Sequence, residues 1–115
     1  MYGDVPLVEG IFVMSKRVDF QKINQLALTH IDTLLMRWLP DGKRIGGEWV
    51  ARNPQRVDRR AGSFKVNLRS GRWGDFATGD YGGDLVSLGA YLHTAGNQRI
   101  AAIEMATMLG VQAYE

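Results

Sequence analysis

Hydrophobic and polar residues alternate most regularly between residues 63 and 69. One set of alternate positions is apolar and the other is polar, with Phe64, Val66 and Leu68 set against Ser63, Lys65, Asn67 and Arg69. A period of two predicts a strand with one face on a core and the other in water. The face predicted to meet water is basic and rich in hydrogen-bonding groups.

Two further strands are expected beside this one. Residues 44–52 predict a first strand, which Gly46-Gly47 interrupts, and residues 72–77 predict a third strand after a tight turn at Ser70-Gly71. Residues 78–83 contain three glycines and are expected to form a loop. The sequence therefore predicts an antiparallel sheet of three strands.

Apolar residues recur at helical spacing on both sides of this sheet. Residues 20–39 predict one helix or two, and Thr29-His30-Ile31-Asp32 resembles a capping box that would open the second. Residues 84–93 and 97–110 predict two more helices. The expected helix ends are N-caps at Asp19, Asp84 and Asn97 and a stop at Gly110. The predicted fold class is α+β, a small three-stranded antiparallel sheet flanked by an N-terminal helical segment and two C-terminal helices.

The length of 115 residues predicts a single domain, which we place at residues 19–115. Residues 1–18 are expected to form an N-terminal extension that is poorly ordered unless a sheet edge binds it. The chain has no cysteine, which excludes disulfides, a thiol nucleophile and thiolate zinc sites. No apolar run is long enough for a membrane span and no signal peptide is recognisable, so we expect a cytoplasmic protein without membrane partners.

Positive charge is concentrated in the middle of the chain. Residues 43–72 carry nine basic side chains and two acidic ones, a local charge of +7, whereas residues 73–115 carry −4. A basic block with interleaved aromatic residues is typical of proteins that bind polyanions. The alternative is an ordinary solvated face that the acidic C-terminal third balances.

The candidate nucleic-acid-binding residues lie within this block. They are the loop arginines, the polar face of the central strand, and a basic and an aromatic residue at the start of the third strand: Arg52, Arg56, Arg59, Arg60, Lys65, Asn67, Arg69, Arg72 and Trp73. Cations would contact phosphates, and an exposed ring would stack on a base. Since successive strand residues face opposite ways, Trp73 and Phe76 are expected on opposite faces with only one of them in the core, and we assign Phe76 to it.

Four short motifs follow one another along the chain, namely Asn53-Pro54-Gln55-Arg56, Gly62-Ser63-Phe64-Lys65-Val66, residues 71–79, and Gly82-Gly83-Asp84-Leu85-Val86. Their order and spacing resemble the N-terminal zinc-ribbon domain of bacterial, phage and plasmid DNA primases. The resemblance covers about residues 29 to 110. It places Asn53, Arg56, Asp75 and Thr78 at the positions of the four zinc ligands, and most of these are poor ligands. It therefore implies a ribbon without metal or other cofactor, held by polar contacts such as one between Arg56 and Asp75.

The same resemblance implies a function in replication. In that family the ribbon helps to recognise single-stranded template, and a separate Toprim domain, for which this chain has no room, performs the chemistry. We therefore expect a non-enzymatic nucleic-acid-binding module, with single-stranded DNA as ligand, in a primase-like protein of a phage, plasmid or mobile element. A helicase, polymerase or primase catalytic domain would be its protein partner, and no small-molecule substrate is evident. The alternatives are an adaptor that docks an acidic replication protein, or a fragment of a larger primase or helicase.

Overall fold

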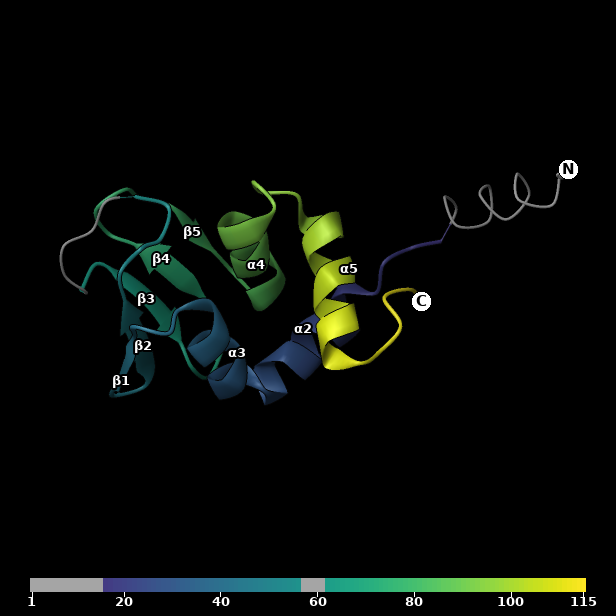
Figure 1. Cartoon of the computed structure of the whole chain (residues 1–115), viewed down its shortest axis with the longest axis horizontal. Coiled ribbons are helices and arrows are strands. Elements are labelled where there is room, and N and C mark those ends of the chain that lie inside the picture. The colour runs from purple at the N-terminus through teal and green to yellow at the C-terminus, as the bar shows by residue number, and fades with distance from the viewer. Residues whose placement is uncertain (1–15, 57–61) are drawn as a thin grey trace, which may run out of the picture.

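The computed structural model describes residues 16–56 and 62–115 and has an α+β fold (Figure 1). Two helices come first, a five-stranded sheet follows, and two helices end the chain. In order, the elements are α2 (Phe20–Thr29), α3 (Ile31–Trp38), β1 (Lys43–Ile45), β2 (Glu48–Ala51), β3 (Phe64–Asn67), β4 (Trp73–Asp75), β5 (Tyr81–Gly82), α4 (Leu85–His93) and α5 (Gln98–Leu109).

The sheet has five strands, not the three expected, in the order β1-β2-β3-β4-β5 with every neighbouring pair antiparallel. The strand predicted over residues 44–52 is a hairpin, because Gly46 adopts φ +61° and reverses the chain between β1 and β2. The loop predicted over residues 78–83 contains β5, in which Tyr81 pairs with Gly74.

Alternation along β3 sets the two faces of the sheet. Phe64 and Val66 are buried, whereas Lys65 is half-buried and Asn67 is exposed, as the pattern predicts. Register extends the buried face across the sheet, since Val66 pairs with Trp49 on β2 and with Trp73 on β4. Side chains directly opposite one another share a face, so both tryptophans point toward the core.

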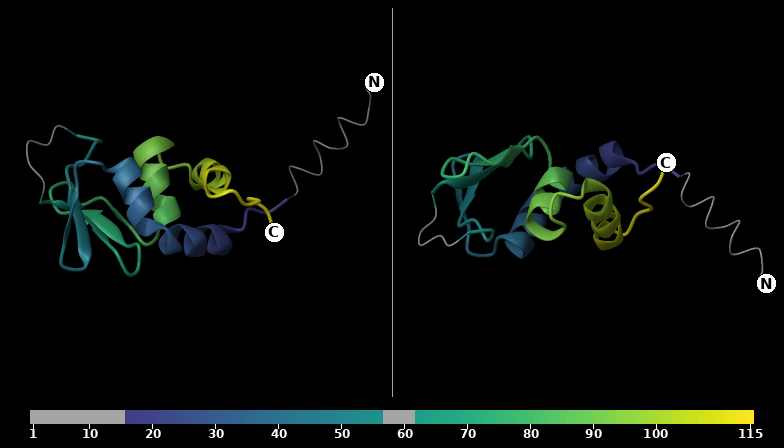
Figure 2. Two further views of the ribbon diagram at one scale, coloured as in Figure 1. Left: turned by 60° about the horizontal axis from the view of Figure 1, so that its bottom comes forward. Right: turned by 90° about the horizontal axis from the view of Figure 1, so that it is seen from above.

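The helices cover this inner face. The indole N–H of Trp73 donates to Ser87 Oγ of α4 at 2.9 Å, and its ring lies 4.7 Å from that of Tyr91. The indole N–H of Trp49 donates to the Leu39 carbonyl just after α3. In Figures 1 and 2 the sheet lies at one end of the molecule and α5 lies toward the other, with α4 between them. No helix of the described residues covers the opposite face of the sheet, which we call the outer face (Figure 2).

Three of the predicted helix caps are confirmed by side-chain hydrogen bonds. Asp19, Asp84 and Asn97 each accept from the backbone amide three residues on, and Asp84 forms a capping box with Ser87. Gly110 ends α5 in the left-handed region, at φ 76°.

The capping box expected at residues 29–32 is wrong, although the segment does divide into two helices. His30 is the N-cap of α3 and makes no side-chain cap hydrogen bond. Thr29 stays within α2, where its hydroxyl donates to the Gln25 carbonyl at 3.0 Å. Because Thr29 is still in helical conformation within α2, its side chain bonds back to the preceding turn and is not at the N-cap position of α3.

The start of the described chain packs against its end. Val18 forms a β-bridge with Tyr114, and the Asp19 amide donates to the Ala113 carbonyl at 2.8 Å. Residues 1–15 lie outside the described part, so their expected disorder stays a prediction. Within the described part, no helix combines the length and hydrophobicity needed to span a membrane.

Candidate nucleic-acid interface and its supporting polar cluster

The outer face of the sheet combines cations, polar groups and exposed aromatic rings. One row crosses four strands, with Val50 opposite Lys65, Lys65 opposite Gly74, and Gly74 opposite Tyr81. Arg72 and Phe76 flank β4, each two residues from Gly74. Residues two apart in a strand point to the same face, so both lie on the same side of the sheet as Gly74. Three of the predicted binding residues, namely Lys65, Asn67 and Arg72, therefore gather on this face.

Two aromatic rings stand out from the outer face. Phe76 is 81% exposed and Tyr81 is 83% exposed, the two highest values among the large hydrophobic residues described. Gly74 has no side chain to separate them, and the Tyr81 Cβ lies 3.6 Å from where a Gly74 Cβ would stand. The Lys65 ammonium lies 5.6 Å from the centroid of the Phe76 ring. We call Phe76, Tyr81, Lys65 and Arg72 the aromatic platform.

The assignment of Trp73 to stacking and of Phe76 to the core is wrong. Trp73 is only 6% exposed and packs against α4, whereas Phe76 is in water. The reason lies in the register of β4. Trp73 pairs with the buried Val66, so the Trp73 side chain must point to the core side of the sheet. Period two alone states that the two rings are on opposite faces, but not which face is covered.

A shallow hollow of about 240 Å³ lies within the outer face. Its lining includes Glu48, Lys65, Asn67, Arg72, Gly74 and Phe76. Asn67 also orders the turn after β3, since its side-chain oxygen accepts from the amides of Arg69 and Ser70, both at 2.9 Å. Arg69 and Arg72 are exposed on this turn.

The loop arginines lie apart from this hollow. Arg52 is exposed, 3.7 Å from Asp41, and together with Arg56 it lines a separate hollow of about 260 Å³. Arg59 and Arg60 lie outside the described residues. The structure therefore brings Arg52 and Arg56 together, but at a different hollow from Lys65 and Arg72.

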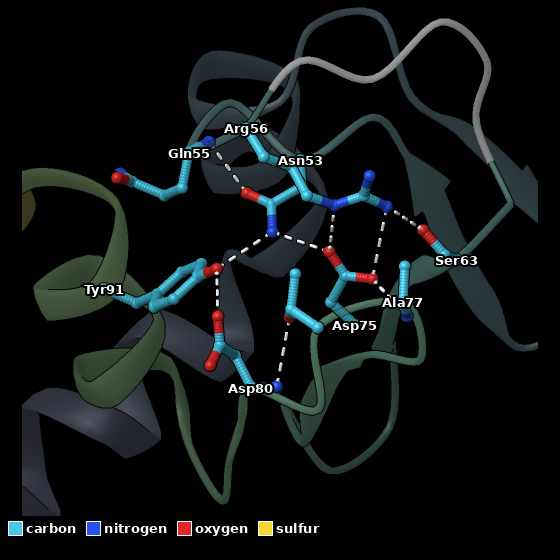
Figure 3. A network of polar contacts seen from close by, with 9 residues as sticks. Asn53, Gln55, Arg56, Ser63, Asp75, Ala77, Asp80 and Tyr91 are labelled. Carbon is cyan, nitrogen blue, oxygen red and sulfur yellow. Dashed lines mark hydrogen bonds and ion pairs between the residues drawn. The ribbon is translucent and has the colours of Figure 1, made fainter.

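Asn53, Arg56, Ser63, Asp75 and Tyr91 are joined by hydrogen bonds, and we call them the polar cluster (Figure 3). The buried carboxylate of Asp75 accepts from Arg56 Nε at 3.0 Å and from Asn53 Nδ2 at 2.7 Å. Asn53 Nδ2 also donates to Tyr91 Oη at 2.9 Å, and Arg56 Nη2 donates to Ser63 Oγ at 2.7 Å. The expected contact between Arg56 and Asp75 is confirmed. It engages the guanidinium of Arg56 within the protein, so this arginine contributes to the fold.

The two chain segments that meet in the polar cluster share one pattern of local hydrogen bonds. Asn53 Oδ1 accepts from the Gln55 amide at 2.8 Å, and Asp75 Oδ1 accepts from the Ala77 amide at 2.8 Å. Each segment also forms a turn in which a backbone amide donates to the carbonyl three residues earlier. The Arg56 amide donates to the Asn53 carbonyl and the Thr78 amide to the Asp75 carbonyl, both at 3.3 Å. Thr78 does not join the cluster through its hydroxyl, which accepts from the Asp80 amide instead.

The environment of the polar cluster changes the pKa of two of its members. Burial alone would raise the pKa of the Asp75 carboxyl, but hydrogen bonds from Arg56, Asn53, the Ala77 amide and Ser63 outweigh it and hold that pKa well below its ordinary value. Burial raises the pKa of the Tyr91 phenol, and its hydrogen bond to Asp80 adds to this effect. Asp75 is therefore ionised and Tyr91 neutral at physiological pH.

Sequence reasoning missed Tyr81, Glu48 and Tyr91. The glycine-rich surroundings of Tyr81 suggested a loop, although its position opposite a glycine places it on the sheet. Among residues 16–56 and 62–115, no group of three or more His, Asp or Glu side chains could hold a metal ion. Comparison of the chain with protein-family models, curated proteins and solved structures finds no match.

Proposed function

We propose that this chain is a single-strand nucleic-acid-binding module, with DNA as its ligand, and that the aromatic platform is its binding surface. The observation that carries the proposal is the pair of exposed rings, Phe76 and Tyr81, beside Lys65 and Arg72 on the uncovered face of the sheet. Exposed hydrophobic groups that gather in one patch rimmed by polar residues are typical of interaction sites. Single-strand binders combine such rings with a basic groove.

The platform suits a flexible strand better than a duplex. Two rings on neighbouring strands can stack on two unpaired bases, whereas the bases of a duplex are stacked on one another. Lys65 and Arg72 lie within the same face and can contact the phosphates between these bases. Affinity would then depend on salt, because each phosphate contact releases counterions.

The proposal extends to the primase-like plan that the sequence resembles. Its support is the geometry of the polar cluster, since three of the four positions assigned to zinc ligands, Asn53, Arg56 and Asp75, are joined by hydrogen bonds. The two similar turns that end at Arg56 and Thr78 add to this support. In this proposal the polar cluster replaces the metal, and the module presents template to a separate catalytic domain of a phage, plasmid or mobile-element replication system.

The test is fluorescence anisotropy of a labelled 12-nucleotide single strand across a salt series. We expect Phe76→Ala and Tyr81→Ala each to weaken binding by about 1 kcal/mol or more, the loss of one stacked base. Arg72→Ala should weaken binding and reduce the salt slope by about 0.7. Met36→Ala and Arg37→Ala are the matched controls, since both side chains are exposed on α3.

Two results would count against the proposal. Absence of binding at low salt would remove the nucleic-acid function and leave docking of an acidic protein as the alternative. Equal losses in the platform variants and in the α3 controls would show that binding occurs elsewhere on the molecule.

A further inference from the structure

The hollow on the outer face contains a carboxylate, which is unexpected on a surface that binds a polyanion. Glu48 Oε1 lies 3.9 Å from Lys65 Nζ, and the Glu48 side chain is partly exposed into water. A phosphate placed in this hollow would be repelled by the carboxylate. If nucleic acid lies across this face, a part of it other than phosphate must meet Glu48.

The hollow is small and has one aromatic wall. Its volume of about 240 Å³ is below the range of about 300–1,000 Å³ that drug-sized ligands occupy. Phe76 supplies an aromatic wall, and Gly74 leaves the floor open because it has no side chain. Lys65 and Arg72 are cationic donors at its border, so the hollow offers donors and one bidentate acceptor around an aromatic ring.

We infer that this hollow is a base-reading pocket that prefers guanine, an inference that rests on the proposed single-strand binding. A carboxylate accepts two parallel hydrogen bonds. Among the four DNA bases, only guanine presents two adjacent donors on its Watson–Crick edge, N1–H and the N2 amino group. Guanine also presents two acceptors, O6 and N7, that arginine recognises, and the exposed side chain of Arg72 borders the hollow.

The other bases satisfy these groups less well. Adenine and cytosine each offer a single amino group beside a ring acceptor, which would face the Glu48 carboxylate and be repelled. Thymine offers a single N3–H between two carbonyl oxygens. In each case one carboxylate oxygen loses its partner, so the preference arises from Glu48, while Phe76 stacks on any base.

The test uses twelve-nucleotide oligo-dT strands in which one central residue is dG, dI, dA or dC. Inosine matches guanine except that it lacks the N2 amino group. We expect the parent protein to bind the dG strand about fivefold more tightly than the dA, dC or all-dT strands, with dI in between. Glu48→Gln should bring the dG to dI ratio close to one, whereas Glu48→Asp should keep part of the preference.

The dG to dI ratio is the informative quantity, because Glu48→Gln also removes a negative charge, and this charge effect alone should strengthen binding to every strand by the same factor. Equal affinity for all four bases, or a dG preference that persists in Glu48→Gln, would overturn the guanine pocket and leave single-strand binding intact. Failure to bind any strand at low salt would overturn both. Thermal unfolding of each variant confirms that the compared proteins are folded.

Discussion

Replacing Asp75 by asparagine tests the polar cluster most directly. The substitution keeps the size of the side chain but puts an amide N–H₂ where one of the carboxylate oxygens now accepts. Asp75 Oδ2 accepts from Arg56 Nε and Asn53 Nδ2, and Oδ1 accepts from the Ala77 amide and, at 3.5 Å, from Arg56 Nη2. Whichever way the new amide turns, at least one of these donors faces another donor instead of an acceptor.

The magnitude follows from the burial of the pair. Breaking a buried ion pair by removing one partner costs about 3–5 kcal/mol, and leaving a buried donor unsatisfied costs about 1–3 kcal/mol. The Asp75 side chain is fully buried, but that of Arg56 is 29% exposed and can recover part of its hydration. We therefore expect Asp75→Asn to lower the free energy of unfolding by about 3 kcal/mol, at the low end of the first range.

Urea unfolding followed by tryptophan fluorescence measures this loss. With a slope of about 1–3 kcal/mol per M, a loss of about 3 kcal/mol lowers the urea midpoint by about 1–3 M. The matched control is Asp32→Asn, which removes the same charge from an ion pair with Arg44 in which both side chains are more than half exposed. It should cost under about 1 kcal/mol. If Asp75→Asn cost no more than Asp32→Asn, the buried carboxylate of the polar cluster would not stabilise the fold.

Two further predictions concern the same residues. Since the folded-state pKa of Asp75 is depressed, its contribution to stability is fully present above the ordinary aspartate pKa of about 3.9 and is lost as pH falls below it, toward the folded-state pKa. Urea midpoints at pH 7 and pH 3 should show the gap between parent and Asp75→Asn shrinking on acidification, and a gap that stays constant would contradict this. A variant with Asn53→Cys, Arg56→His, Asp75→Cys and Thr78→Cys should bind Zn²⁺ and rise in Tm with it. Absence of binding in a zinc titration would count against the primase-like alignment.

Local periodicity was sufficient to predict the elements that bury a regular face. The strand at Phe64–Asn67 and helices α4 and α5 follow from alternation and caps that lie within a few residues of one another. Strands β1 and β5 carry no such signal. All three residues of β1 are exposed, and β5 has two residues, so both are defined by hydrogen bonds to a neighbouring strand. Pairing of this kind cannot be read from a local pattern.

The candidate site was predictable where it depended on charge and not where it depended on register. The basic face of β3 is as expected, and the contact between Arg56 and Asp75 follows from aligning two motifs that are far apart in sequence. The choice between Trp73 and Phe76 required the pairing of β4 with β3. A slip of one residue in that pairing exchanges the two faces, which is why alternation alone could not decide which ring is buried.

The polar cluster and the aromatic platform are linked through adjacent residues. Asp75 points inward to Arg56 and Asn53, and the next residue, Phe76, points outward. The backbone on both sides of Phe76 is held, since its own amide donates to the Ser63 carbonyl at 3.0 Å and the following amide, of Ala77, donates to Asp75. Backbone held in this way need not be ordered when a base stacks on the Phe76 ring, which lowers the entropic cost of binding. The cross-link that stabilises the two turns therefore also prepares the surface proposed to bind the strand.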